Sequence, residues 1–434
     1  MAQGLIAVCQ MTATNDKLKN FETVKRLVHE AKEAKAIVAF LPEACDFFGS
    51  SREETFSLAE PIGGPLVQAY KELARNNGIW LSFGGLHEFT GTEKLKNTHI
   101  IINDEGEIVG YYNKTHLFDV DIPSQNVKLL ESSFIERGQT VPEPVETPVG
   151  KIGLSICYDV RFPELSLALA RMGADILTYP SAFTFSTGAS HWEVLLRAKA
   201  IETQCFVVAA AQIGMHNKKR SSWGHGMVID PWGNVIAQCS DVEGIVTAPI
   251  NLEYLHKVRS TMPLLKHRRY DLYPAMAVRI AGAGTRTQSV YDFGHVKIPM
   301  ETVFLQTDKT FAFTNKRCVV PGHVLVAPIR PVQRLSELTP DEICDLFLVT
   351  QKVSKAMESI QQATSCTIVV QDGPDAGQTI KHVHVHVLPR KRGDFADNDD
   401  IYGELQKHDK DPSRPYRTEE EMNEEAAMIR DMLK

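Results

Sequence analysis

Three histidines alternate with three valines in the last third of the chain, between His382 and position 387. Successive side chains on a β-strand point to opposite faces, so the pattern predicts a half-buried strand with His382, His384 and His386 on one face. Three imidazoles on one face can bind zinc, can lie in a core and hydrogen-bond to backbone carbonyls, or can form a nucleophile with its supports. The alternation alone leaves all three interpretations open.

The segment before the histidines favours the nucleophile. No cysteine or acid in it completes an obvious set of metal ligands, so we expect no metal site. Small residues and hydrogen-bond donors suit a backbone that approaches a phosphate through its N–H groups. The segment QDGPDAGQT at 371–379 contains four of them: Gly373, Gly377, Gln378 and Thr379.

A second candidate site lies in the first half of the chain. Glu43, Lys114 and Cys157 each follow a strand-like run, and a helix is predicted to begin near Pro163, just after Cys157. A thiolate that attacks a carbonyl carbon needs a proton acceptor and a donor for the developing oxyanion. Layered α/β folds place their sites at the carboxyl ends of strands. Each residue taken singly is more often a core, turn or surface residue.

The elements around these residues indicate two domains, as the length of 434 residues also suggests. Over the first 280 residues, strand-like runs alternate with helical patterns such as 20–34 and 163–173, which predicts helices packed on sheets in layers. The runs 98–104 and 107–114 predict a hairpin. Residues 281–289 are small and polar, as in a linker, and short strands and a long helix follow.

Four ordered motifs give the first domain a family resemblance. They are FLPEA at 40–44, YNKTHLFD at 112–119, ICYDVRFPEL at 156–165 and GHGMVIDPWG at 224–233. Together they closely resemble the nitrilase superfamily, in particular its Nit amidase branch, over residues 4–280. The resemblance implies an αββα sandwich for domain 1–280.

The same resemblance implies the roles of five residues. Cys157 attacks an amide carbon, with Glu43 as the general base. Lys114 and the backbone N–H of Tyr158 stabilise the oxyanion, and water then hydrolyses the thioester. Glu131 matches a second acid that positions the substrate or the water.

The Nit branch also suggests a substrate. It resembles amidases that act on deaminated glutathione, and an ω-amidase for other 2-oxo acid amides is the alternative. One departure concerns the entrance loop, which reads SQN at 124–126 where relatives usually have glycine after the proline. This departure bears on the substrate more than on the chemistry.

The second domain has a resemblance of its own. HVHVHVLP at 382–389, the preceding DGPDAGQT and the upstream NKRCVVPGHVLVAPIRP at 315–331 closely resemble the histidine-triad superfamily. The branch is that of the Fhit-like dinucleoside polyphosphate hydrolases. The match covers 293–434 and implies an α+β histidine-triad domain that dimerises, with 281–292 as the linker.

In that family the middle histidine attacks the α-phosphate. The resemblance implies that this residue is His384, which would form a nucleotidyl-histidine intermediate that water releases. It also implies that His382 orients His384, that His386 contacts the phosphate or the leaving group, and that His323 supports the triad from behind. Diadenosine triphosphate, cleaved to AMP and ADP, is the expected substrate. The positions that match the family's substrate-binding residues are Asn315, Gln371, Gly377, Gln378, Thr379 and Ile380.

Composition restricts the partners. A net charge of −7 argues against a general binder of nucleic acid or of membrane surfaces, and no run approaches a membrane span. Eight scattered cysteines fit a reducing, cytoplasmic location. We expect small-molecule substrates and no required cofactor, although a divalent cation can accompany the polyphosphate. The resemblances imply a homotetramer.

Two rival hypotheses come from other classes of protein. The C-terminal domain could act mainly as a dinucleotide-binding signalling module that turns over slowly. Alternatively, the fusion could serve association, with one site idle. The intact set of Glu43, Lys114 and Cys157 argues against an idle amidase.

Overall fold

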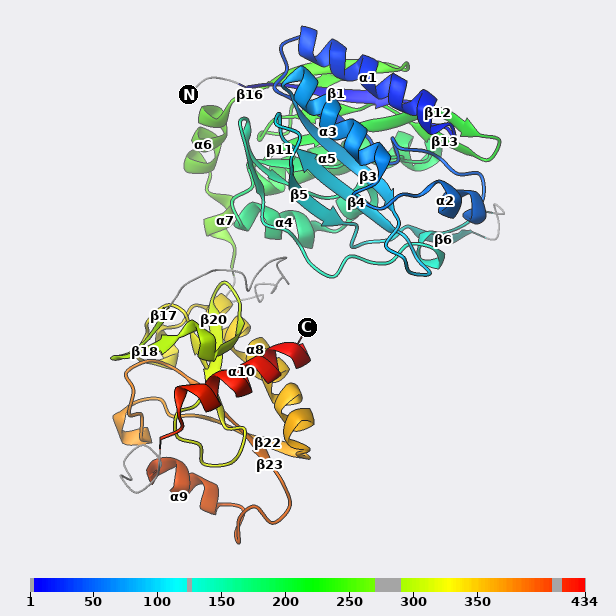
Figure 1. Cartoon of the computed structure of the whole chain (residues 1–434). Coiled ribbons are helices and arrows are strands. Elements are labelled where there is room, and N and C mark those ends of the chain that lie inside the picture. Colours follow the sequence, from blue (N-terminus) through cyan, green and yellow to red (C-terminus); the bar gives the residue numbers. More distant parts are fainter. Residues whose placement is uncertain (1–3, 123–126, 270–289, 408–415, 434) are drawn as a thin grey trace. The chain divides into compact units, whose positions relative to one another are not determined.

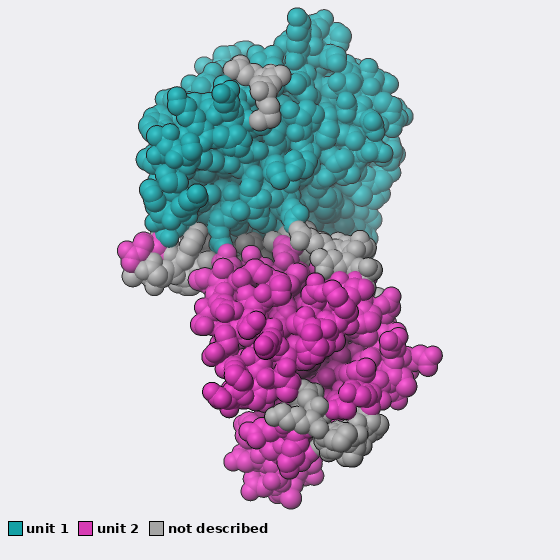
Figure 2. All heavy atoms as spheres, turned by 90° about the vertical axis from the view of Figure 1, so that its left-hand side faces the viewer, with its two compact units in different colours: residues 1–268, 278–281 teal, residues 269–277, 282–434 magenta. Residues whose placement is uncertain are grey.

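The computed structural model describes residues 4–122, 127–269, 290–407 and 416–433. Its contacts divide the chain into two compact units (Figure 2), and the division falls between positions 268 and 282. The predicted linker lies largely outside the described residues. Its last three positions belong to β17 (Val290–Phe293), so the linker prediction is wrong there.

Two sheets form the middle of unit 1. The first runs in the order β13 (Arg220–Trp223), β12 (Ala211–Asn217), β1 (Gly4–Met11), β2 (Val38–Leu41), β3 (Trp80–Glu88), β4 (Lys96–Ile102), β5 (Ile108–Asn113), and β16 (Gly244–Ile250) also pairs with β1. The second runs in the order β15 (Val235–Gln238), β14 (Met227–Ile229), β11 (Phe206–Ala209), β10 (Ile176–Thr178), β9 (Gly150–Gly153), β8 (Val145–Thr147). A small separate hairpin joins β6 (Asp119–Ile122) to β7 (Val127–Leu130).

Helices α1 (Lys17–Glu33) and α3 (Pro65–Asn77) lie together on the outer face of the first sheet (Figure 1). Apolar residues at helical spacing, such as Val24, Leu27 and Val28, give α1 one buried face. That face packs with Tyr70 of α3 on alternate residues of the strands, including Leu41. This contact forms the first of the two larger cores in unit 1.

The second core lies between the sheets and extends to the helices beyond. Ile6 and Val38 from the first sheet share it with Ile176 and Val207 from the second. On the far side, the same cluster includes Leu196 of α5 (Phe185–Thr203). The remaining helices of this unit are α2 (Arg52–Leu58), α4 (Pro163–Arg171), α6 (Leu252–Thr261) and α7 (Leu264–His267). The predicted αββα sandwich is confirmed.

Two local predictions have different outcomes. The hairpin is confirmed, since β4 and β5 pair antiparallel. The strand-like run expected directly before Cys157 is shorter than predicted, because β9 ends at Gly153 and Cys157 opens the 3-10 helix η3 (Cys157–Arg161). Apolar residues continue through Ile156, so hydropathy alone does not mark the end of the strand. The chain enters α4 with Pro163 in its first turn, as predicted.

The main sheet of unit 2 is antiparallel, in the α+β arrangement expected. Its order is β19 (Val303–Gln306), β20 (Thr310–Thr314), β21 (Val324–Pro328), β23 (Val385–Arg390), β22 (Ser365–Val370). Helices α8 (Pro340–Gln361) and α10 (Glu419–Leu433) contribute Leu346 and Ile429 to the core on one face of this sheet. The hairpin of β17 and β18 (Val296–Pro299) contributes to a second cluster, and α9 (Asp400–Lys407) to a third.

The histidine segment differs from the predicted half-buried strand. β23 begins only at Val385, so His382 and His384 precede it. The alternation itself is confirmed, because Val383, Val385 and Val387 all pack into the core with α8, while the rings of His382 and His384 contact Phe293 in a different cluster. Both sets are buried. Burial of imidazoles requires hydrogen-bond partners for their ring nitrogens.

None of the helices in the described ranges is long and apolar enough to cross a membrane.

Two candidate active sites

Cys157 occupies a strained turn in unit 1. Its φ of 47° lies in the left-handed region, which a residue with a Cβ rarely adopts without support from its surroundings. The Cys157 N–H donates to the carbonyl of Pro180 at 2.9 Å. Such backbone strain clusters at active sites.

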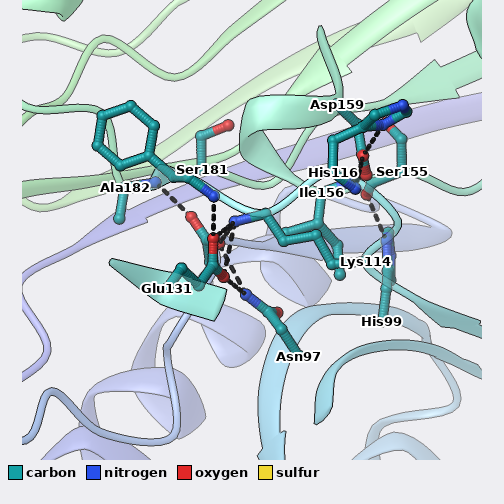
Figure 3. A network of polar contacts seen from close by, with 12 residues as sticks. Asn97, His99, Lys114, His116, Glu131, Ser155, Ile156, Asp159, Ser181 and Ala182 are labelled. Atoms are coloured by element: carbon teal, nitrogen blue, oxygen red, sulfur yellow. Dashed lines mark hydrogen bonds and ion pairs between the residues drawn. The ribbon is translucent and has the colours of Figure 1, made fainter. Parts of the chain in front are cut away.

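Three hydrogen-bond donors surround the carboxylate of Glu43, just beyond the end of β2. Oε1 accepts from Lys114 Nζ at 2.9 Å and from Asn97 Nδ2 at 3.0 Å. Oε2 accepts from the backbone N–H of Ala182 at 3.0 Å (Figure 3). The Cys157 thiol, acting as a donor, lowers the pKa of this carboxylate, while the Glu43 charge raises the pKa of Cys157. Glu43 is therefore placed to take the thiol proton.

Lys114 lies between two carboxylates at the end of β5. Its Nζ contacts Glu43 and both oxygens of Glu131, each of the latter at 3.0 Å. Glu131 is held in turn by the Phe118 N–H at 2.7 Å and by Asn97 Nδ2 at 3.1 Å. One ammonium thus neutralises one of two adjacent carboxylates, and Glu131 lies in the same network as predicted.

The pKa directions define the resting protonation states. Burial raises the pKa of Glu43, but the Lys114 charge and the thiol hydrogen bond outweigh it, so the pKa lies below its ordinary 4.5. Burial lowers the pKa of Lys114, yet Glu131 and Glu43 raise it well above its ordinary value. Burial and the Glu43 charge raise the pKa of Cys157. The resting site holds a carboxylate, an ammonium and a protonated thiol.

A cavity of about 350 Å³ opens onto these groups. Tyr158 lines this cavity, and its backbone N–H is the group predicted to stabilise the oxyanion. The lining includes the cationic side chains of Arg161, Lys219 and Arg220, and also the imidazole of His87. Burial lowers the pKa of His87, but the Asp46 carboxylate beside it raises the pKa overall. The cavity therefore suits an anionic substrate.

Sequence reasoning missed two members of this site, Asn97 and the N–H of Ala182. Asn97 binds both carboxylates from β4, where it reads as an ordinary polar residue at the start of an apolar strand. Ala182 contributes only its backbone, which has no signature in a sequence. The entrance loop at 124–126, where the sequence departs from the Nit relatives, lies outside the described residues.

In unit 2, the middle histidine has a defined tautomer. His384 Nδ1 lies 2.8 Å from the carbonyl oxygen of His382. Because a carbonyl can only accept, Nδ1 carries the proton and the lone pair of the neutral ring is on Nε2. Phe293 of β17 meets the ring edge to face, with centroids 5.1 Å apart. His384 is thus prepared as a nucleophile at Nε2.

The orienting group is the backbone carbonyl of His382 rather than its imidazole. That imidazole donates from Nε2 to the Pro328 carbonyl at 2.8 Å and accepts from the Gly294 N–H at 3.3 Å. Burial lowers the pKa of His382 and keeps the ring neutral. The predicted support of His384 by His382 is present in this altered form.

A hydrogen-bonded pair forms the rear of the triad. The Val319 N–H donates to His323 Nδ1 at 3.2 Å, so the proton of His323 is on Nε2, which lies 2.9 Å from His386 Nδ1. His386 then carries its own proton on Nε2. Asn315 Nδ2 lies 3.3 Å from His323 Nδ1, so this predicted substrate residue contacts the rear of the triad here.

Hydrogen bonds of the Gln378 side chain hold the loop before the triad in its conformation. Gln378 Oε1 accepts from the Gly373 N–H at 2.9 Å, and its Nε2 donates to the carbonyl of Gln333 at 3.0 Å. Gly377 has a φ of 91°, and a Cβ there would meet Gln371 Nε2 at 2.9 Å. Thr379 is exposed, and Ile380 packs against the cluster around Phe293. The loop brings these residues to the histidine side of the sheet.

Over the part of the chain that the structure describes, no cluster of three or more His, Cys, Asp or Glu residues is arranged to hold a metal ion.

Fold and sites together define a hydrolase of two units: a thiol amidase on an αββα sandwich and a histidine-triad hydrolase on an α+β sheet. Comparison with known families agrees. The family model of carbon-nitrogen hydrolases matches residues 5–260, and that of the HIT domain matches residues 298–393.

Similarity to individual proteins extends over the whole chain. The nitrilase and fragile histidine triad fusion protein NitFhit of Caenorhabditis elegans is 49% identical over 437 residues, covering 100% of this chain and 98% of the relative. A crystal structure of the C. elegans NitFhit protein matches with a TM-score of 0.89 and 45% identity, covering 100% and 99% of the two chains. Human deaminated glutathione amidase is 55% identical over 273 residues, 62% of this chain and 83% of that protein. The chain belongs to the family of nitrilase and fragile histidine triad fusion proteins and is bifunctional, with an amidase unit followed by a HIT hydrolase unit.

Proposed function

We propose that unit 1 hydrolyses deaminated glutathione or a close 2-oxo acid amide. The observation that supports this substrate class is the cationic lining of the cavity, with Arg161, Lys219 and Arg220 near a buried thiol. Such a substrate carries carboxylates that those side chains can bind. The human relative with 55% identity is named for this activity.

The proposed reaction proceeds through a thioester. Glu43 takes the Cys157 proton as Sγ bonds to the amide carbon, and the oxyanion forms beside Lys114 and the N–H of Tyr158. Glu43 returns the proton to the leaving nitrogen, and the C–N bond breaks. Water then gives a proton to Glu43 and attacks the thioester carbon, with Glu131 positioning it. The C–S bond breaks and the thiol regains its proton.

Unit 2, we propose, cleaves dinucleoside polyphosphates, with diadenosine triphosphate giving AMP and ADP. The supporting observation is the tautomer of His384, which leaves the lone pair of the neutral ring on Nε2, the atom that we propose attacks the α-phosphorus. The bond from the α-phosphorus to the ADP oxygen breaks as the phosphorus–nitrogen bond forms. His386 contacts the phosphate or the leaving group, and water releases AMP. Phosphoryl transfer depends mainly on such positioning and charge relief.

One experiment tests both proposals. The intact protein is incubated briefly with diadenosine triphosphate, and separately with deaminated glutathione or 2-oxoglutaramate, and is then mapped by mass spectrometry. We expect an adenylate adduct on His384 and an acyl adduct on Cys157. Adduct formation on another residue, or amide turnover by a Cys157→Ser variant, would contradict the assignments. Faster turnover of 2-oxoglutaramate would make unit 1 an ω-amidase.

The rival signalling hypothesis for unit 2 has its own test. A His384→Asn variant removes the nucleophile while keeping a side chain of similar polarity. We expect it to lose hydrolysis and still bind diadenosine triphosphate in calorimetry. A wild-type protein that binds the dinucleotide but gives no AMP would favour the signalling module.

We further propose a cytoplasmic homotetramer with small-molecule substrates, no required cofactor, and no nucleic-acid or membrane partner. Exposed apolar side chains support assembly, because Val194 and Ile201 of α5 are 69% and 47% exposed, and Phe347 and Leu348 of α8 are 43% and 48% exposed. All eight cysteines are free thiols, which fits a reducing compartment. Sedimentation analysis and cell fractionation test these proposals.

A further inference from the structure

Asp159 is a buried carboxylate near the amidase site that the reaction above does not use. It follows Cys157 by two residues, is fully buried and takes part in five hydrogen bonds. The partners in these five hydrogen bonds all belong to the two segments that carry Lys114 and Cys157. A buried carboxylate with so many partners fixes the groups around it, because moving any of them would leave charge or polarity unpaired.

The carboxylate of Asp159 contacts both the segment that carries Cys157 and the segment that carries Lys114 (Figure 3). Oδ2 accepts from the Ile156 N–H at 2.8 Å, directly before Cys157, and from the Tyr112 hydroxyl at 2.8 Å. Oδ1 accepts from the His116 N–H at 3.1 Å and lies 2.7 Å from His116 Nδ1. His116 is two positions after Lys114, so one carboxylate joins the segment of the catalytic lysine to that of the nucleophile.

Neighbouring contacts hold the same turn from other sides. His99 Nδ1 donates to the Ser155 carbonyl at 3.0 Å, and the Cys157 N–H donates to Pro180. Burial lowers the pKa of His99 to about 4, so its ring is neutral. On the lysine side, the His116 ring stacks on Phe162 with centroids 3.8 Å apart and planes at 8°. These contacts restrain both segments that Asp159 joins.

We propose that Asp159 is a positioning residue for the amide hydrolysis: with His116, it sets the distance between Lys114 and the strained turn of Cys157. The inference rests on the proposed amidase function. Without the contacts of Asp159 with Ile156 and His116, Cys157 can leave its positive φ, which moves Sγ away from Glu43. The bound substrate keeps its contacts with the cationic lining, so the contacts of Asp159 govern turnover rather than affinity.

The test compares Asp159→Asn with a matched control. In the variant, one oxygen becomes an NH₂ group, which must face the Ile156 N–H or the His116 N–H. Asp175→Asn is the control, because Asp175 also accepts a backbone N–H, that of Lys151 at 3.1 Å, and pairs with Arg259 at 3.2 Å. Asp175 does not line the cavity.

Two readouts are measured on the full chain. With deaminated glutathione, we expect Asp159→Asn to lower kcat about tenfold to hundredfold, with KM changed less than about threefold, since a small misplacement of reacting groups has effects of this size. Alkylation of Cys157 by iodoacetamide, mapped on its peptide, should slow by a similar factor. Asp175→Asn should change neither, although it can lower the melting temperature.

Further variants keep the inference testable if Asp159→Asn does not fold. His116→Gln removes only the ring contact, and we expect a smaller loss of kcat with unchanged KM. In the double variant, the losses of kcat should not add, because both residues act through the same contact between Asp159 and His116. A wild-type kcat and alkylation rate in His116→Gln, or a loss in Asp159→Asn that appears only in KM, would overturn the inference. A wild-type protein inactive on deaminated glutathione would refute the proposed substrate, while the alkylation rates would still decide this point.

Discussion

Replacement of Glu43 by glutamine is the most direct test of the amidase geometry. Glutamine has nearly the same shape, but it is a poor base and one carboxylate oxygen becomes an NH₂ group. The donors around Glu43 are Lys114 Nζ, Asn97 Nδ2 and the Ala182 N–H. Whichever way the amide is turned, it presents a donor to at least one of them. The variant therefore loses both the proton acceptor and part of its fixed position.

The expected loss follows from the role of the carboxylate. A positioned general base contributes about 10²- to 10⁴-fold, which corresponds to about 2.7–5.4 kcal/mol in the activation free energy. Burial raises the pKa of Cys157, so its thiol does not ionise on its own at neutral pH. We expect kcat/KM of Glu43→Gln to fall within that range at pH 7 and to rise with pH as hydroxide replaces the base.

The assay is ammonia or amine release from the amide substrate between pH 6 and about 9, the range in which thiols ordinarily begin to ionise. Glu88→Gln is the control, because Glu88 is also a buried glutamate of unit 1 and accepts from the hydroxyls of Thr98 and Tyr111. It lies outside the cavity lining and should keep the wild-type rate. If Glu43→Gln retains more than about a tenth of the wild-type rate, the assignment of the base is refuted.

Four further predictions concern unit 2. His323→Ala removes the donor to His386 Nδ1, so AMP release from diadenosine triphosphate should slow about tenfold, as for loss of a hydrogen bond of ~1.4 kcal/mol; an unchanged rate would remove His323 from the triad. The pKa of Glu342 is lowered to about 2, first by hydrogen bonds from Arg330. A folded pKa below the ordinary 4.5 stabilises the fold above that value, and the stabilisation is lost as the pH falls towards 2. Urea unfolding should show this slope, and Glu342→Gln should lack it. Gly377→Ala should destabilise unit 2 by about 1–3 kcal/mol, because its φ of 91° and the nearby Gln371 oppose a Cβ. Gly403→Ala on α9, where a Cβ meets nothing within 4 Å, should instead stabilise the helix by up to about 1 kcal/mol.

The layers of unit 1 and the strand ends with Glu43 and Lys114 could be predicted from the sequence. Apolar runs that end in a charged residue mark a strand and its carboxyl end, and helical spacing marks α1. The length of β9 could not be predicted, because the chain remains apolar up to Ile156 after the strand has ended. Only backbone direction distinguishes the turn at Cys157 from a longer strand.

The histidine triad illustrates a second limit. Alternation of histidine and valine is typical of a strand with one face in solvent, but here both faces are buried. Burial of His382, His384 and His386 depends on distant partners, such as Phe293 and Pro328, that local sequence does not identify. Backbone groups of the sites also cannot be predicted from residue type. The carbonyl of His382 and the N–H of Ala182 act without any contribution from their side chains.

The position of β1 within its sheet has a consequence for biosynthesis. This first strand pairs with β2 on one edge, but its other pairings are with β12 and with β16, where Gly4 meets Ile250. At about 5–20 residues per second, the ribosome needs roughly 12–50 s between these two residues. Throughout that time an apolar strand edge of the nascent chain is unpaired, and such edges promote aggregation. The β16 side of β1 therefore stays without its strand partner until residue 250 has left the ribosome.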